Sequence, residues 1–278
     1  MTMLKQRIIT ALVLLAVLIP SLLASQAWPF ASIVVVLVAA AAWEWGRLNG
    51  VAGAGPALIA AVVLLLCALQ IWEILPRAVE FAIFGIASIV WVCGAAWALR
   101  GGVDGWRHTP RWARLTVGVL VLSVAAVALL RARQVGLGFV LSIFCIVWVA
   151  DVAAYAAGRA FGRRKLAPAI SPGKSWEGVL GAVLAVGLLG WVWLVAQSML
   201  GDLGPSVFSA LRERFGVLSA VLLVGLVAMS VVGDLFESLV KRAAGVKDSS
   251  GLLPGHGGVL DRIDALLPVF PLVMALTR

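Results

Sequence analysis

The stretch VGLGFVLSIFCIVWVADVAAYAA, residues 135–157, decides the class of fold because it contains a single charged residue, Asp151. About 20 consecutive apolar residues are enough for an α-helix to cross the hydrocarbon core of a bilayer. A helix also satisfies every backbone N–H and C=O group within the segment, which lipid cannot do. The stretch therefore predicts a transmembrane helix.

Similar apolar runs lie on both sides of this stretch, at residues 8–24, 30–48, 56–75, 79–99, 115–133, 178–200 and 216–236. A final run, 265–277, is short for a span and contains Pro268 and Pro271, so we expect it to be kinked or only partly embedded. The composition agrees, because 63% of the residues are hydrophobic and 13% are charged, whereas a soluble domain has about 25% charged residues. The predicted fold class is an all-α, polytopic integral membrane protein with about nine transmembrane helices.

The basic residues predict the orientation in the membrane. The chain has 22 lysines and arginines and a formal net charge of +9. Most of these residues fall on one side if the N-terminus, with Lys5 and Arg7, is cytoplasmic, as the positive-inside rule requires. A basic cytoplasmic face attracts anionic lipid headgroups. We therefore expect a cytoplasmic N-terminus, with membrane lipid and not nucleic acid as the partner.

The polar motifs are distributed unevenly between two regions. Residues 1–134 hold few acids, and we interpret them as an N-terminal transmembrane helical scaffold. Glu44 in this region lies between two tryptophans at a predicted helix end, so we expect an interfacial role for it. Residues 135–278 form the predicted catalytic region, with cytoplasmic loops at 159–177 and 241–262.

The first of these loops contains SPGKS, residues 171–175. Glycine, lysine and hydroxyl groups in a turn can hold a phosphate through backbone N–H groups and a point charge, although the loop is not a Walker A motif. The alternative is a basic loop that rests on lipid headgroups. Asp151, on the last turns of the preceding helix, is either a functional acid or a partner for Arg159.

The eighth apolar run continues into GDLFESLVKR, residues 233–242. Asp234, Glu237, Ser238 and Lys241 are spaced by three or four residues, so a helix places them on one face. An ion pair between Glu237 and Lys241, at i and i+4, is the simplest explanation for those two. It leaves Asp234, a turn deeper, without a partner, which makes Asp234 a candidate functional acid.

The segment GHGGVLDRID, residues 255–264, precedes the last apolar run. Its glycines allow a ligand to approach the backbone closely. Asp261 and Asp264 lie on one face of the following helix and, with Asp234, provide three carboxylates for Mg²⁺, which usually binds carboxylates together with substrate phosphates. Basic side chains suited to phosphate surround them: Lys241, Arg242, Lys247, His256 and Arg262. This combination is typical of phosphoryl or nucleotidyl transfer.

Residues 238–264, SLVKRAAGVKDSSGLLPGHGGVLDRID, resemble the signature of the phosphatidate cytidylyltransferases, also called CDP-diacylglycerol synthases. The matching positions are Ser238, Lys241, Arg242, Lys247, Asp248, Ser250, Pro254, His256, Gly257, Gly258, Asp261, Arg262 and Asp264. The segment SPGKSWEG at 171–178 also resembles this family, with Ser175 where threonine is commoner. Further matches are Asp151, Tyr155, Gly158 and Gly162. The N-terminal half resembles the family only in being helical and hydrophobic.

The resemblance implies transfer of CMP from CTP to phosphatidic acid, with CDP-diacylglycerol and pyrophosphate as products, in the cell's inner (cytoplasmic) membrane. It implies Mg²⁺ as the cofactor, with or without a second cation, and leaves a homodimer open. The implied metal ligands are Asp234, Asp261 and Asp264, which form the implied catalytic set with Lys241. The implied substrate-binding residues are Ser171, Lys174, Ser175, Glu177, Ser238, Arg242, Lys247, Asp248, His256 and Arg262.

Two other classes of function stay open. A CTP-dependent polyprenol or dolichol-type lipid kinase would share membrane helices and a cytidine nucleotide, but it would release CDP rather than pyrophosphate. An anion or lipid transporter would line a path with polar residues. Against a transporter stand the absence of an internal repeat in the sequence and the clustering of charge on one face.

Overall fold

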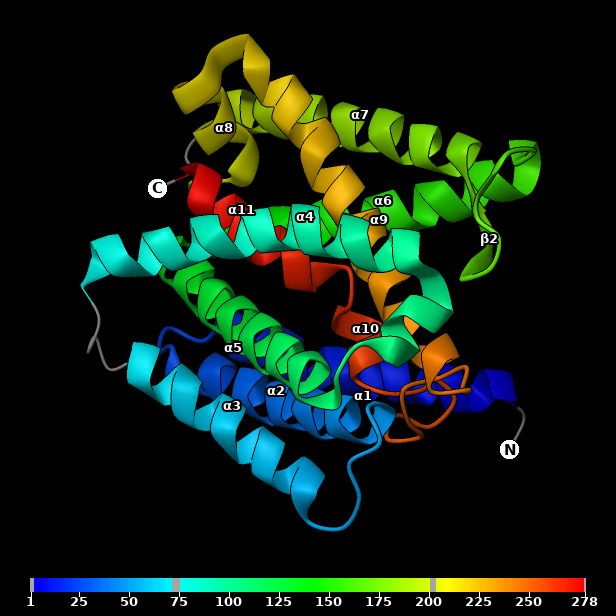
Figure 1. Cartoon of the computed structure of the whole chain (residues 1–278). Helices are drawn as coiled ribbons and strands as arrows, with labels where there is room; N and C mark the ends of the chain where they lie inside the picture. Colours follow the sequence, from blue (N-terminus) through cyan, green and yellow to red (C-terminus); the bar gives the residue numbers. More distant parts are fainter. Residues whose placement is uncertain (1–2, 72–75, 201–203, 278) are drawn as a thin grey trace.

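The structure is a computed structural model that describes residues 3–71, 76–200 and 204–277. Its helices are α1 (Met3–Leu23), α2 (Trp28–Leu48), α3 (Gly55–Ile71), α4 (Arg77–His108), α5 (Arg111–Val135), α6 (Leu137–Phe161), α7 (Trp176–Leu200), α8 (Val207–Phe215), α9 (Ser219–Ala243), α10 (Leu260–Ile263) and α11 (Leu266–Thr277). In the described residues, the only strands are β1 (Lys165–Ala167) and β2 (Ser171–Ser175), which form an antiparallel hairpin. The predicted all-α fold class is confirmed (Figure 1).

Every predicted apolar run forms a helix. Among the described residues, six segments are long and apolar enough to cross a membrane: Trp28–Leu48, Arg77–His108, Arg111–Val135, Leu137–Phe161, Trp176–Met199 and Val207–Ala243. The runs at 8–24 and 56–75 form shorter apolar helices, Ile8–Leu23 and Gly55–Leu69, and residues 72–75 of the second lie outside the described residues. The last run forms the short helix α11 with Pro271 inside it.

Helix α4 extends beyond the predicted run 79–99 as far as His108. It is interrupted at Gly102, whose backbone angles (φ 64°, ψ −164°) are not helical. Only glycine adopts this conformation without steric cost, so the chain changes direction here. The residues after Gly102 reach the end of α9, where Arg107 Nε donates to the carbonyl of Ala243 (3.0 Å).

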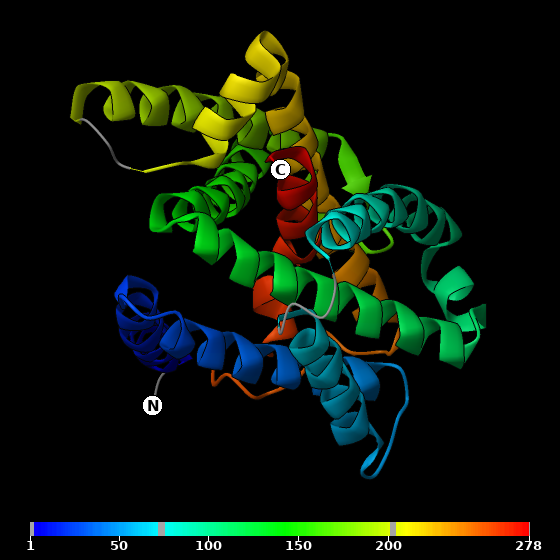
Figure 2. The ribbon, with the colours of Figure 1, turned by 90° about the vertical axis from the view of Figure 1, so that its left-hand side faces the viewer.

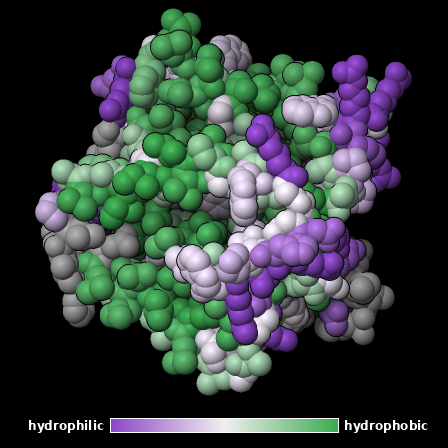
Figure 3. Space-filling model, viewed as in Figure 1, coloured by the Kyte–Doolittle hydropathy of each residue, from purple (hydrophilic) through white to green (hydrophobic). Residues whose placement is uncertain are grey.

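The polar segments gather at one end of the helical bundle. Figure 1 shows the start of α1, the β1–β2 hairpin, α10 and the bend in α4 on the right of the view, with α8 and the C-terminus at the opposite end. Hydrophilic residues concentrate on the same right-hand side in Figure 3. Thr10 Oγ1 on α1 donates to the carbonyl of Pro254 (2.9 Å), which ties the N-terminal helix to this polar end. The polar segments thus gather on one side, as the distribution of the basic residues predicts.

Helix α11 lies in the middle of the molecule and joins its two halves into one hydrophobic core (Figure 2). It packs against α4 and α5 from the first half and against α9 from the second. At Gly233, the backbone of α9 lies so close to the carbonyl of Asp264 and to Pro268 that an added Cβ would collide with them. This contact fixes α10 and the start of α11 against the polar end of α9.

We predict that the polar end is cytoplasmic and that α8 faces the opposite side. Two exposed acids distinguish the sides: Asp104, after the bend in α4, and Glu213, on α8. In a chain whose native cysteines are replaced, a membrane-impermeant maleimide added from outside should label Glu213→Cys and spare Asp104→Cys. Labelling of Asp104→Cys but not of Glu213→Cys would show that the chain has the opposite orientation.

Candidate active site

A cavity of about 660 Å³ with charged side chains in its walls opens at the end of the bundle that carries the hairpin. Its walls come from α6, the hairpin, the start of α7 and α9, and they bring together Asp151, Ser171, Lys174, Ser175 and Asp234. The volume is in the range that small-molecule sites occupy. The sequence motifs at 171–178 and 233–242, far apart in the chain, therefore face one cavity.

Lys174 connects the hairpin to α9 across this cavity. Its Nζ lies 2.6 Å from Asp234 Oδ2, and Asp234 Oδ1 also accepts a hydrogen bond from Ser238 Oγ (3.3 Å). The expectation from the sequence that Asp234 lacks a partner is thus wrong, because its partner comes from another element. Arg159 donates to the hydroxyl of Tyr155 (3.0 Å), and the described part of the chain gives it no contact with Asp151.

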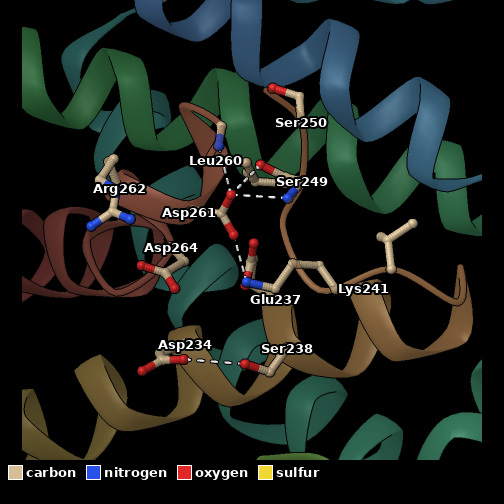
Figure 4. A network of polar contacts seen from close by, with 12 residues as sticks. Asp234, Glu237, Ser238, Lys241, Ser249, Ser250, Leu260, Asp261, Arg262 and Asp264 are labelled. Atoms are coloured by element: carbon tan, nitrogen blue, oxygen red, sulfur yellow. Dashed lines mark hydrogen bonds and ion pairs between the residues drawn. The ribbon is translucent and has the colours of Figure 1, made fainter. Parts of the chain in front are cut away.

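A second charged cluster centres on Lys241, at the end of α9 (Figure 4). Lys241 Nζ lies 2.5 Å from Glu237 Oε2 and 2.5 Å from Asp261 Oδ1. Glu237 is 2% exposed. The predicted i, i+4 ion pair is confirmed, but Lys241 is shared with Asp261, so the pair is part of a three-residue cluster.

Asp261 accepts hydrogen bonds from several donors that its sequence spacing does not predict. Its Oδ2 accepts hydrogen bonds from Ser249 N (2.9 Å), Ser249 Oγ (2.8 Å) and Gly258 N (2.7 Å). Burial alone would raise the pKa of Asp261, but hydrogen bonds from Lys241 and from the amides of Gly258 and Ser249 outweigh it, and the pKa falls to about 2. Asp261 is therefore a fixed, ionised carboxylate.

Asp264 follows α10 and lies between Asp261 and Asp234 in the view of Figure 4. Its Oδ1 accepts a hydrogen bond from the amide of Ala265 (2.7 Å). Burial, and next the negative charge of Asp234, raise the pKa of Asp264 to about 8. The carboxylates of this region therefore repel one another when no further positive charge is present.

The set of acidic oxygen donors fits a divalent cation. Four carboxylates face two lysines: Asp234, Glu237, Asp261 and Asp264 against Lys174 and Lys241. Within residues 3–71, 76–200 and 204–277, no group of three or more His, Cys, Asp or Glu side chains lies close enough to hold a metal ion by itself. Mg²⁺ commonly uses one or two carboxylates and completes its shell with water and substrate phosphates. The donors present fit that kind of site rather than an all-protein cage.

Two of the predicted substrate-binding residues, Ser175 and Glu177, also hold the hairpin in place. Ser175 is buried, and its Oγ accepts a hydrogen bond from the amide of Gly178 (3.2 Å), the arrangement of a helix N-cap at the start of α7. The Glu177 carboxylate accepts from the backbone amides of Arg163 (3.1 Å) and Arg164 (3.2 Å). Both residues position the loop that carries Ser171 and Lys174.

The remaining predicted residues lie at the end of α9, on the loop after it and on α10, and they are not among the residues that line the cavity. Arg242 donates to the carbonyl of Val246 (3.2 Å), and Arg262 donates to the carbonyl of His256 through Nε (3.1 Å). Lys247 and Asp248 are exposed, and His256 is half-buried. The structure thus brings together the lysine–carboxylate pairs and leaves these residues at the edge of the polar end.

Sequence reasoning missed Glu44. This residue of α2 is fully buried, so the prediction of an interfacial role is wrong. Its carboxylate accepts hydrogen bonds from the loop that leads into α10. The donors are Ser249 Oγ (3.1 Å), Ser250 Oγ (2.5 Å), Val259 N (2.9 Å) and Leu260 N (2.7 Å). The sequence did contain one signal for this role: Glu44 is an acid within an apolar helix, and burial of an acid there is costly unless it has partners.

Gly258 of this loop is closely packed against two side chains. A Cβ added there would lie well under 3.0 Å from Ser249 Oγ and from Glu44 Oε1. We expect Gly258→Ala to lower the free energy of unfolding by about 1–3 kcal/mol, the usual cost of overpacking. Turnover should fall too, because Gly258 N also holds Asp261.

Gly251→Ala is the matched control, because a Cβ at Gly251 meets no atom within 4 Å. It should change the free energy of unfolding by no more than about 0.5 kcal/mol. Thermal unfolding and turnover of the purified variants measure both effects. Equal behaviour of the two variants would contradict the tight packing at Gly258.

Comparison with known proteins identifies relatives of the chain. Residues 5–278 match the model of the family described as "Cytidylyltransferase family". The chain is 39% identical, over 99% of its length and 97% of the relative's, to a Pseudomonas aeruginosa protein named phosphatidate cytidylyltransferase. Proteins of that name from Haemophilus influenzae and Brucella suis are 49% and 39% identical over 49% and 59% of this chain, and over 44% and 56% of their own lengths.

Proposed function

The chain belongs to the cytidylyltransferase family, and from this membership we propose that it transfers the cytidylyl group of CTP to phosphatidic acid, with CDP-diacylglycerol and pyrophosphate as products. The observation that carries the proposal is the near full-length similarity to the Pseudomonas aeruginosa phosphatidate cytidylyltransferase. The position of the site supports it. A cavity with charged side chains in its walls, at the end of membrane-length helices, can receive a lipid headgroup from the bilayer and a nucleotide from water.

The chemistry needs alignment more than proton transfer. An ionised oxygen of the phosphatidate headgroup attacks the α-phosphorus of CTP, and the bond from that phosphorus to the β-phosphate oxygen breaks, so pyrophosphate leaves. Because the attacking oxygen is already ionised near neutral pH, a general base has little to add. The protein must hold two polyanions in line and offset their repulsion.

Lysines supply the positive charge in this proposal. Lys174 lies on the cavity wall and is paired with Asp234, so an incoming phosphate would compete with that carboxylate for the ammonium group. Lys241 would act in the same way beside Asp261. Ser171 adds a hydroxyl at the cavity wall. Arg242, Lys247, Arg262 and His256 are proposed to bind the outer phosphates from the loop.

Mg²⁺ is proposed as the cofactor, with Asp234 and Asp261 as its principal ligands and Asp264 as the next. When bound, the ion would neutralise charge on the phosphate oxygens during transfer. The supporting observation is the excess of carboxylates over lysines around Lys241 and Lys174.

The membrane location and the oligomeric state complete the proposal. We place the chain in the inner (cytoplasmic) membrane, because CTP is a cytoplasmic solute and the polar end carries the basic loops. A homodimer is included because α7 exposes Leu180, Leu184 and Leu188 at helical spacing. Either lipid chains or a second copy would cover this face, and cross-linking at Leu184→Cys in membranes distinguishes them.

A product assay tests the function directly. The purified chain with CTP, phosphatidic acid and Mg²⁺ should release pyrophosphate and form CDP-diacylglycerol. A polyprenol or dolichol-type lipid kinase would release CDP and need an alcohol acceptor, and a transporter would consume no CTP. Failure to form a CDP-lipid from phosphatidic acid under these conditions would rule out the proposed reaction.

A further inference from the structure

Glu44 connects the scaffold half of the chain to the loop that holds Asp261. We call residues 249–260 the glycine loop. Both oxygens of Glu44 are used by this loop: Oε1 accepts from Ser250 Oγ and Val259 N, and Oε2 accepts from Ser249 Oγ and Leu260 N. Figure 4 shows Ser249 and Leu260 beside Asp261, with Ser250 farther off, toward the blue helix. A fully buried carboxylate with this many donors is fixed in place and fixes its donors in turn.

The contacts of Glu44 and Asp261 meet at one side chain. Ser249 Oγ lies 3.1 Å from Glu44 Oε2 and 2.8 Å from Asp261 Oδ2. A hydroxyl has one proton, so it can donate to only one of the two carboxylates at a time. The amides of Val259 and Leu260 that Glu44 holds come directly after Gly258, whose amide holds Asp261. Displacement of one carboxylate therefore disturbs the donors of the other.

We propose that Glu44 is a positioning residue: it anchors the glycine loop and so holds Asp261 in the orientation that the transfer reaction needs. The expected loss of turnover rests on the proposed function, whereas the expected change in loop mobility does not. Glu44 reaches no atom of the cavity and acts through Ser249, Val259 and Leu260. The first half of the chain thus contributes to the site as well as to the scaffold.

Glutamine at position 44 tests the proposal sharply, because it has nearly the same shape and cannot accept the same bonds. One backbone amide points at each carboxylate oxygen, Val259 N at Oε1 and Leu260 N at Oε2. Whichever way the glutamine amide is turned, its NH₂ group faces one of these N–H donors. The glycine loop must then shift or leave a buried donor unsatisfied.

The matched control is Glu80→Gln. Glu80 is also a buried carboxylate of the first half, but it pairs with Arg131 (2.7 Å) on α5, away from the glycine loop. Loss of a buried acid in general would affect both variants. Loss of the loop anchor would affect Glu44→Gln alone.

The experiment uses the full chain in lipid nanodiscs, with native cysteines replaced and a spin label on Leu252→Cys, an exposed position in the glycine loop. Glu44→Gln should increase the mobility of the label and reduce turnover by about 10²-fold, the cost of a misplacement of about 1 Å. Glu80→Gln should do neither. If Glu44→Gln yields no folded protein, Ser250→Ala, which removes one of the four donors, should increase mobility and reduce turnover several-fold.

If folded Glu44→Gln gave the same label spectrum as the wild-type chain, the proposal would be overturned. It would also be overturned if the label became more mobile while the turnover of Glu44→Gln equalled that of Glu80→Gln. The spectra need no catalysis. If the wild-type chain formed no CDP-diacylglycerol, the proposed function would fail, while the spectra would still decide whether Glu44 anchors the loop.

Discussion

Asp261→Asn should reduce turnover by about 10³-fold or more while the chain still folds, because the change removes charge that helps to stabilise the transferring phosphate. Asparagine can keep the acceptor position that Ser249 and Gly258 use, since its side-chain oxygen can occupy the place of Oδ2. Its NH₂ group then faces Lys241, and that attraction is lost. Lys241 retains Glu237 as a partner, which limits the cost to stability.

Steady-state rates over a range of Mg²⁺ concentrations measure the effect. Asp104→Asn is the control, because Asp104 is an exposed acid at the same end of the bundle. It should leave turnover unchanged. Activity of Asp261→Asn within a few-fold of wild type at limiting Mg²⁺ would remove Asp261 from the proposed ligands.

Asp234→Ala should also cost several orders of magnitude in turnover, whereas Glu237→Gln should cost far less. Asp234 faces the cavity, and its loss removes both a proposed ligand and the partner of Lys174. Glu237 faces Lys241, which keeps Asp261 as a partner when Glu237 is neutralised. Neutral glutamine at position 237 therefore leaves no buried charge unpaired.

A double variant checks this separation. Because Lys241 is proposed to bind phosphate, Glu237→Gln combined with Lys241→Met should be no more active than Lys241→Met alone. Glu237→Gln as damaging as Asp234→Ala would mean that both acids belong to one functional cluster. The proposed metal ligands would then have to be reassigned.

The helices were predictable because their cause is local. Most of the apolar runs are long enough to require a helix in lipid, whatever the rest of the chain does. The end of α4 was not predictable in the same way, since the helix resumes beyond Gly102 and packs against the end of α9. That contact joins segments more than a hundred residues apart.

The site was predictable in its residue types and less so in its pairings. The spacing along one helix predicted the ion pair between Glu237 and Lys241, because both residues share a face of α9. Spacing could not predict the ion pair between Lys174 and Asp234, because that pair depends on how the hairpin packs against α9. Glu44 was misjudged because its tryptophan neighbours suggested an interface, while its four donors lie at the other end of the sequence.

The bonds of Glu44 also bear on how the protein is made. Its partners lie 205 to 216 residues later in the chain. At a translation rate of about 5–20 residues per second, α2 is synthesised roughly 10 to 40 s before the segment that completes it. During biogenesis this carboxylate must remain hydrated or protonated until the glycine loop emerges. A nascent chain that stops before residue 249 therefore holds an acid in α2 without any of the four donors that satisfy it in the folded protein.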